Sequence, residues 1–233
     1  MPLRSRVTSA LVLTAVLVGA GGAAAGCSGP VDGTARPVAE QLSDTRPLSE
    51  LLLEPSAFPP QYPAVILPPQ AVAQAAPDLT GVPPGARVEP AGCKPPPQDY
   101  GPDGTAMVVG TDNSNRSTIT VELLRVDTPL AELGAQIDQC GTVTTTRDGV
   151  AAVVTTTLTP PPPIDADDTL ALRRTVASGS GEQEVMQAML TLVAQIDDVR
   201  VQATYMSFGA DTAVDTETLD GLFTAAVLKV HGN

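Results

Sequence analysis

Residues 186–205, MQAMLTLVAQIDDVRVQATY, decide the fold class of this chain. Apolar residues recur at every second position on both sides of the pair Asp197 and Asp198, and a period of two is typical of β-strands. The two aspartates are a turn signal, so the stretch predicts an antiparallel hairpin. One face is apolar, whereas the other carries mainly polar side chains: Gln187, Thr191, Gln195, Arg200, Gln202 and Thr204. This alternation predicts a sheet that is covered on one face and exposed to solvent on the other.

The sequence outside this hairpin predicts further strands and two well-punctuated helices. The strands are expected over residues 105–111, 117–126, 150–159 and 169–177. One helix begins after the N-cap candidate Thr128 and ends before Gly141, and a C-terminal amphipathic helix spans residues 215–230. Short helices are weaker expectations near residues 47–53 and 70–76. We therefore predict an α+β fold, with about five or six antiparallel strands and two main helices packed on one face.

The composition limits the class of partner. The chain has 233 residues, with 26 acidic against 13 basic side chains and a formal net charge of −13. Nucleic-acid binding is dominated by neutralisation of phosphates, so nucleic acid is not expected as a partner. The negative charge is typical of a protein that is kept soluble by its surface.

The first 27 residues predict export and lipid attachment. Arg4 and Arg6 precede an apolar run over residues 7–20, which is the pattern of a signal peptide. The residues Ala-Ala-Gly-Cys at 24–27 resemble a lipobox, which predicts cleavage after residue 26 and acylation of Cys27. The alternative is an uncleaved membrane anchor, because about 20 apolar residues can span a bilayer.

These features predict the organisation and location of the chain. We expect a signal peptide at 1–26, a lipid-anchored flexible tether at 27–46 and a single α+β domain at 47–233. The predicted location is the extracytoplasmic side of the cell membrane, and the membrane is contacted through the N-terminal lipid.

Only two cysteines remain beyond Cys27, and we predict that Cys93 and Cys140 form a disulfide because the exported compartment is oxidising. Closing a loop of ~47 residues would contribute roughly 4 kcal/mol on the chain-entropy model. The alternative, a metal-binding or catalytic thiol pair, lacks a supporting cluster of histidines.

The sequence offers no convincing catalytic set. The single histidine, His231, lies three residues from the C-terminus, so a Ser-His-Asp or Cys-His arrangement is not expected. The run Ser-Gly-Ser-Gly at 178–181 is interpreted as a hairpin loop and not as a nucleophile turn. Asp165, Asp167 and Asp168 are interpreted as a solvated loop, with calcium binding or acid–base catalysis as the alternative. We predict no catalytic residues, no metal ligands and no cofactor.

The lipobox, the segment LLLEPSAFPPQY at 51–62 and the cysteine pair resemble mycobacterial lipoproteins of the Lpp and Lpq kind. The chain is more distantly similar to the extracellular sensor domain of PknH-type receptor kinases. This resemblance implies an antiparallel sheet with helices, a disulfide and a cleft for an unknown ligand. No catalytic residues come with either resemblance.

Three functions are consistent with these features. The favoured one is a non-catalytic binding or sensing module that recognises an unknown ligand or protein of the cell envelope. The second is a carrier of a lipid or glycolipid, suggested by the apolar residues Val185, Met189 and Val193 on the otherwise polar face of one strand. The third is a hydrolase that uses acids such as Asp165 and Asp168.

Overall fold

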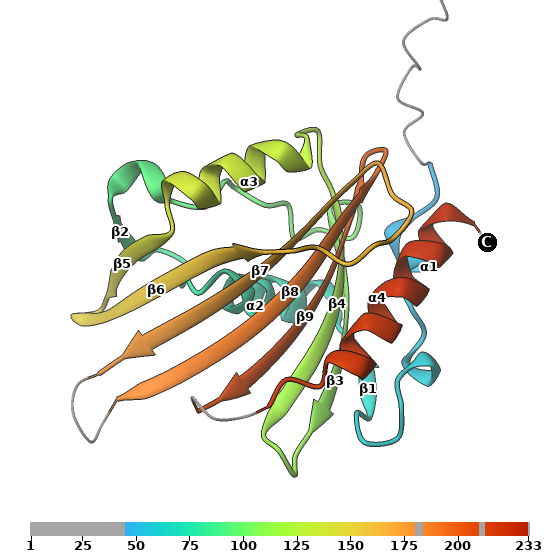
Figure 1. Cartoon of the computed structure of the whole chain (residues 1–233), viewed down its shortest axis with the longest axis horizontal. Helices are drawn as coiled ribbons and strands as arrows, with labels where there is room; N and C mark the ends of the chain where they lie inside the picture. Colours follow the sequence, from blue (N-terminus) through green and yellow to red (C-terminus); the bar gives the residue numbers. More distant parts are fainter. Residues whose placement is uncertain (1–44, 180–183, 210–212, 233) are drawn as a thin grey trace, which may run out of the picture. The chain divides into compact units, whose positions relative to one another are not determined.

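The structure, a computed structural model, describes residues 45–179, 184–209 and 213–232 (Figure 1). The predicted signal peptide, Cys27 and nearly all of the predicted tether lie outside the described residues. Residues 39–233 form one compact unit, and every hydrophobic core cluster that the structure describes lies within it. None of the described helices is both long enough and apolar enough to cross a bilayer.

Within the described residues, nine strands form one antiparallel sheet in the order β1-β3-β4-β9-β8-β7-β6-β5-β2. The strands are β1 (Ala64–Ile66), β2 (Arg87–Glu89), β3 (Thr105–Asp112), β4 (Ser117–Arg125), β5 (Thr142–Arg147), β6 (Val150–Thr159), β7 (Asp168–Ser178), β8 (Val185–Ile196) and β9 (Val199–Phe208). The predicted hairpin is confirmed as β8 and β9, which lie at the centre of the sheet and pair from Ile196 with Val199 outward. Asp197 in the turn adopts a φ of 49°, a left-handed conformation that aspartate tolerates.

Helices cover both faces of this sheet. They are α1 (Leu48–Leu51), α2 (Pro69–Thr80), α3 (Leu130–Gln139) and α4 (Thr216–His231), with short 3-10 turns at Pro55–Ala57 and Ala91–Cys93. Helices α1 and α4 pack with the main core on one face, which includes Val108 of β3. Helix α2 packs against Met107, the neighbour of Val108, and therefore lies on the opposite face. Helix α3 contacts β6 and β7 (Figure 1).

The C-terminal helix forms where its sequence predicts. Asp215 caps the N-terminus, because its side chain accepts a hydrogen bond of 3.1 Å from the Thr218 amide. Gly232 ends the helix with a φ of 82°, which favours glycine. The buried stripe packs on β4, β8 and β9: Leu219, Leu222, Phe223, Ala226, Val227 and Val230.

The predicted fold class is wrong in two respects. Over the described residues the sheet has nine strands and not five or six, and four helices lie on both of its faces. The domain is therefore mostly β. Two of the additional strands, β1 and β2, are three-residue edge strands in proline-rich sequence, where periodicity carries no signal. A third, β5, is rich in threonine and joins β6 through Asp148 and Gly149, whose positive φ angles of 51° and 80° fit a tight hairpin turn.

Candidate ligand-binding cavity

A cavity of about 470 Å³ lies on the face of the sheet opposite α4. Strands β4, β6, β7, β8 and β9 contribute its floor, and α2, α3 and residues 95–99 contribute its walls. Its size falls in the range of small-molecule sites, roughly 300–1,000 Å³.

The floor comes from the face that the alternation marks as polar. Thr191, Arg200 and Gln202 were expected on a solvent-exposed face, and all three line the cavity instead. Because α2 and α3 stand over this face, its polar side chains are enclosed. Thr191 and Arg200 are accordingly buried, with 3% and 7% of their surface exposed.

Glu122 of β4 is a buried acid in this floor. Only 3% of the residue is exposed, and the amide of Gln98 donates a hydrogen bond of 2.9 Å to its Oε1. Among the described residues no cation lies within ion-pair distance of Glu122. Burial raises the pKa of Glu122 from 4.5 to about 7, because the charged form loses its hydration. Near neutral pH this carboxyl therefore holds a proton about half of the time.

Arg174 of β7 stands at one end of the floor. Its Nε donates to Thr156 Oγ1 at 3.1 Å, and its Nη1 donates to the carbonyl oxygen of Leu79 at the end of α2. Burial lowers the pKa of Arg174 to about 10, so the guanidinium stays protonated at neutral pH.

Arg200 of β9 stands at the other end. Its Nε donates to Gln195 Oε1 at 3.0 Å, and its Nη2 donates to the carbonyl oxygen of Thr128 at 2.9 Å. Burial lowers the pKa of Arg200 as well. Within the part of the chain that the structure describes, no carboxylate lies within ion-pair distance of Arg174 or Arg200.

The two arginines are separated along the strands. Arg174 pairs with Met189 of β8, whereas the partner of Arg200 on the same strand is Gln195. Six residues of a strand span roughly 20 Å, so the two backbone positions mark the ends of an elongated floor.

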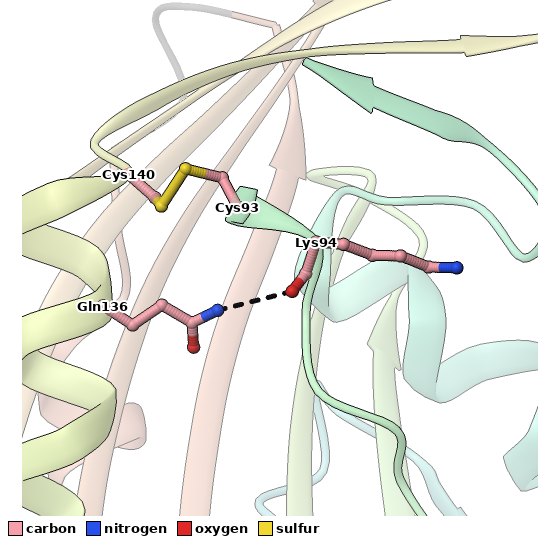
Figure 2. Close-up of a disulfide and its surroundings, with 4 residues drawn as sticks. All are labelled: Cys93, Lys94, Gln136 and Cys140. Atoms are coloured by element: carbon pink, nitrogen blue, oxygen red, sulfur yellow. Dashed lines mark hydrogen bonds between the residues drawn. A yellow bond between two sulfur atoms is a disulfide. The ribbon is translucent and has the colours of Figure 1, made fainter. Parts of the chain in front are cut away.

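A proline-rich strap, defined here as residues 94–99, runs along the cavity wall. At its start the predicted disulfide between Cys93 and Cys140 is present, and it joins the strap to the C-terminal end of α3 (Figure 2). Gln136 of α3 also donates to the carbonyl oxygen of Lys94 at 3.4 Å (Figure 2). Near its other end Gln98 binds Glu122 and also donates to Thr105 Oγ1 at 3.1 Å. The strap is therefore fixed at both ends.

The other acids and hydroxyls singled out in the sequence do not form a site with this cavity. Asp165, Asp167 and Asp168 are exposed and do not line it. Asp167 accepts a hydrogen bond of 2.7 Å from the Asp197 amide, which gives it a role in the turn.

His231 is exposed and bonds to the carbonyl oxygen of Asp165 at 2.9 Å. Ser178 ends β7, whereas residues 180 and 181 lie outside the described residues.

The three residues that suggested a lipid carrier do not line the cavity either. Val185 is 55% exposed, whereas Met189 and Val193 are buried with 3% and 0% of their surface exposed. These three residues thus pack within the domain or point to solvent, and the apolar sheet residues that do line the cavity come from other strands, among them Leu124 of β4 and Leu172 of β7.

Sequence reasoning did not single out Glu122, Gln98 or Arg174. Glu122 carried a usable signal, because it is the only charged residue in the apolar strand sequence ITVELL at 119–124. A charged residue within such a strand is almost never fully buried unless it is paired or functional. Gln98 and Arg174 carried no comparable signal, since a loop glutamine and a strand arginine are ordinary surface residues.

Residues 53–231 match the family described as "Domain of unknown function (DUF5642)". No curated protein is significantly similar to the chain. The described fold is similar to the crystal structure of an uncharacterised protein of Mycobacterium smegmatis, the Rv0999 ortholog. The two sequences are 20% identical and the TM-score is 0.42, and the match covers 75% of this chain and 92% of that one. It is also similar to the extracellular domain of PknH from Mycobacterium tuberculosis, with 13% identity, a TM-score of 0.40 and coverage of 81% and 99%. The resemblance to mycobacterial lipoproteins stays a prediction.

Proposed function

We propose that this chain, which belongs to the DUF5642 family, is a non-catalytic binding module that holds a small molecule between its sheet and helices α2 and α3. The observation that carries the proposal is the cavity of about 470 Å³ itself, in which a few polar groups converge among apolar walls. This combination is typical of small-molecule sites.

The chemistry of the lining supports binding over catalysis. Cys93 and Cys140 both line the cavity, but each is held in the disulfide and cannot act as a thiolate nucleophile. His231 lies outside the lining, so no imidazole base faces Glu122 or the cavity threonines. The titratable groups that do face the cavity are suited to recognising charge and hydrogen-bonding groups.

We place this module outside the cytoplasm, anchored by lipid on Cys27. The support is the signal-peptide pattern over residues 1–26 and the disulfide, which is typical of oxidising compartments. A tether over residues 27–46 would let the domain meet a small ligand, or a partner protein, of the cell envelope.

The test is native mass spectrometry of the full chain, purified gently from its own type of host. We expect a bound mass that is released on denaturation. A variant that fills the cavity, Gln202→Trp, should lose this mass, because Gln202 lines the floor. Thr157→Trp is the matched control, because Thr157 is exposed and does not line the cavity.

The proposal also predicts stabilisation by ligand. A small-molecule extract of the host envelope should raise the unfolding temperature of the wild type and of Thr157→Trp, and it should leave Gln202→Trp unchanged. An apo mass together with no stabilisation by the extract would contradict the binding function.

A further inference from the structure

We propose that the ligand of this cavity is an organic anion, with carboxylate, phosphate or sulfate chemistry on an apolar body, and that Arg174 and Arg200 hold its acidic groups. This inference rests on the proposed function and adds the class of ligand to it.

The first support is that neither arginine has a counter-ion among the described residues. Charges removed from water are normally paired, because an unpaired one keeps the cost of desolvation without compensation. Arg174 and Arg200 each donate to one side-chain oxygen and one backbone carbonyl, all of them neutral acceptors. Their remaining N–H groups have no acceptor among the described residues, and both side chains line the same cavity.

The second support is the geometry of the donor. A guanidinium presents a planar fork that matches the oxygens of carboxylate and phosphate groups, and such charge-assisted bonds are the strong ones. The bonds through Nε fix the plane of each guanidinium, to Thr156 in one case and to Gln195 in the other. The two forks are therefore oriented before any ligand arrives, which lowers the entropy cost of binding.

The third support is the lining between the two arginines. Leu79, Leu133, Ile137 and Leu172 provide apolar surface from α2, α3 and β7. A bare inorganic ion would leave this surface unused, so an anion with an apolar body fits better. The elongated floor, with an arginine near each end, also suits a ligand with acidic groups at both ends.

The acids of the cavity do not cancel the two positive charges. Asp99 and Asp127 line it but are exposed, so water and salt screen them. Glu122 is buried, and its protonated form is neutral and can donate a hydrogen bond to an anion. At mildly acidic pH the enclosed part of the cavity is therefore positive.

A pair of matched dyes tests the charge preference directly. The anionic dye 1-anilinonaphthalene-8-sulfonate and its neutral analogue N-phenyl-1-naphthylamine share their ring system and differ by the sulfonate. Fluorescence titration of the full chain, with residues 39–233 in parallel, should show tighter binding of the anionic dye by at least about tenfold, which is about 1.4 kcal/mol.

Variants then locate the charge. The dye carries one sulfonate, so Arg174→Gln or Arg200→Gln, whichever removes the arginine that holds it, should weaken binding of the anionic dye by about tenfold or more, as should the double variant, and the neutral dye should be unchanged. Arg173→Gln is the matched control, since Arg173 is the neighbour on β7, is exposed and points to the opposite face. Circular dichroism checks that each variant is folded.

A second measurement needs no variant. Decanoate should displace the anionic dye from the wild type at a concentration at least about tenfold lower than decanol does, because only decanoate carries charge.

The possible results distinguish failure of the proposed anion from failure of the proposed binding function. The proposed preference for an anion is refuted if both dyes bind equally, if the arginine variants bind the anionic dye like the wild type, or if decanol competes as well as decanoate. None of these results contradicts the binding function itself. If neither dye binds saturably, the binding function itself fails. Preferential binding of the anionic dye that depends on Arg174 or Arg200 supports the inference.

Discussion

The buried carboxyl of Glu122 predicts a specific dependence of stability on pH. Its pKa is about 7 in the folded domain against an ordinary value of 4.5, so the folded state keeps a proton that the unfolded chain releases. Stability therefore falls as pH rises between these two values. Each unit of difference in pKa corresponds to about 1.36 kcal/mol, so protonation of Glu122 contributes about 3 kcal/mol of stability at low pH. About 2.5 kcal/mol of this contribution is lost between pH 5 and pH 8.

Replacing Glu122 by Gln isolates this effect from the other acids of the chain. The amide is neutral at every pH and retains an oxygen that can accept the hydrogen bond from Gln98. We therefore expect the difference in unfolding free energy, Glu122→Gln minus wild type, to rise by about 2.5 kcal/mol between pH 5 and pH 8. The assay is urea unfolding followed by circular dichroism at several pH values.

The matched control is Glu132→Gln on α3, because Glu132 is exposed and does not line the cavity. Its difference from the wild type should stay flat across the same pH range. A flat difference for Glu122→Gln, within about 0.5 kcal/mol, would show that Glu122 titrates as an ordinary surface acid and would refute the reasoning from burial.

Two further predictions concern the parts that hold the cavity and the helix in place. The double variant Cys93→Ala with Cys140→Ala should lose about 4 kcal/mol of unfolding free energy in urea, because the disulfide closes a loop with a sequence separation of 47 residues. Equal stability of the double variant and the wild type would show that the disulfide does not stabilise the fold. Asp215→Ala should lose about 1 kcal/mol and lower the unfolding temperature, since the Thr218 amide loses its cap, and an unchanged temperature would contradict the capping role.

The long elements of the fold follow from the sequence, and the short ones do not. Strands β8 and β9 were predictable because their alternation runs over many residues on both sides of one turn. Strand β5 was missed because threonines replace apolar residues in it, although Asp148 and Gly149 carried the turn signal. The edge strand β1 exists only because β3 offers it a partner, with Val65 opposite Val109, and no local pattern encodes such pairing.

The cavity could not be predicted from the sequence for a different reason. Alternation assigned Arg200 and Gln202 to the correct face of the sheet, but it could not show whether water or a helix covers that face. The cover depends on α2 packing against Met107 and on the disulfide that holds the strap to α3. Both are long-range contacts, so a polar face on a strand is compatible with either a wet surface or the floor of a site.

The opposition between an acidic surface and a basic cavity gives the proposed site its selectivity. With 26 acidic against 13 basic side chains, the surface repels nucleic acid and anionic membrane surfaces. At physiological salt the field of exposed acids is screened beyond about 8 Å, whereas charges inside the cavity are screened much less. A small anion that reaches the floor therefore experiences mainly Arg174 and Arg200, and not the net charge of the chain. It follows that neutralising exposed acids should alter chiefly the rate of association and its salt dependence, whereas neutralising either arginine alters the affinity itself.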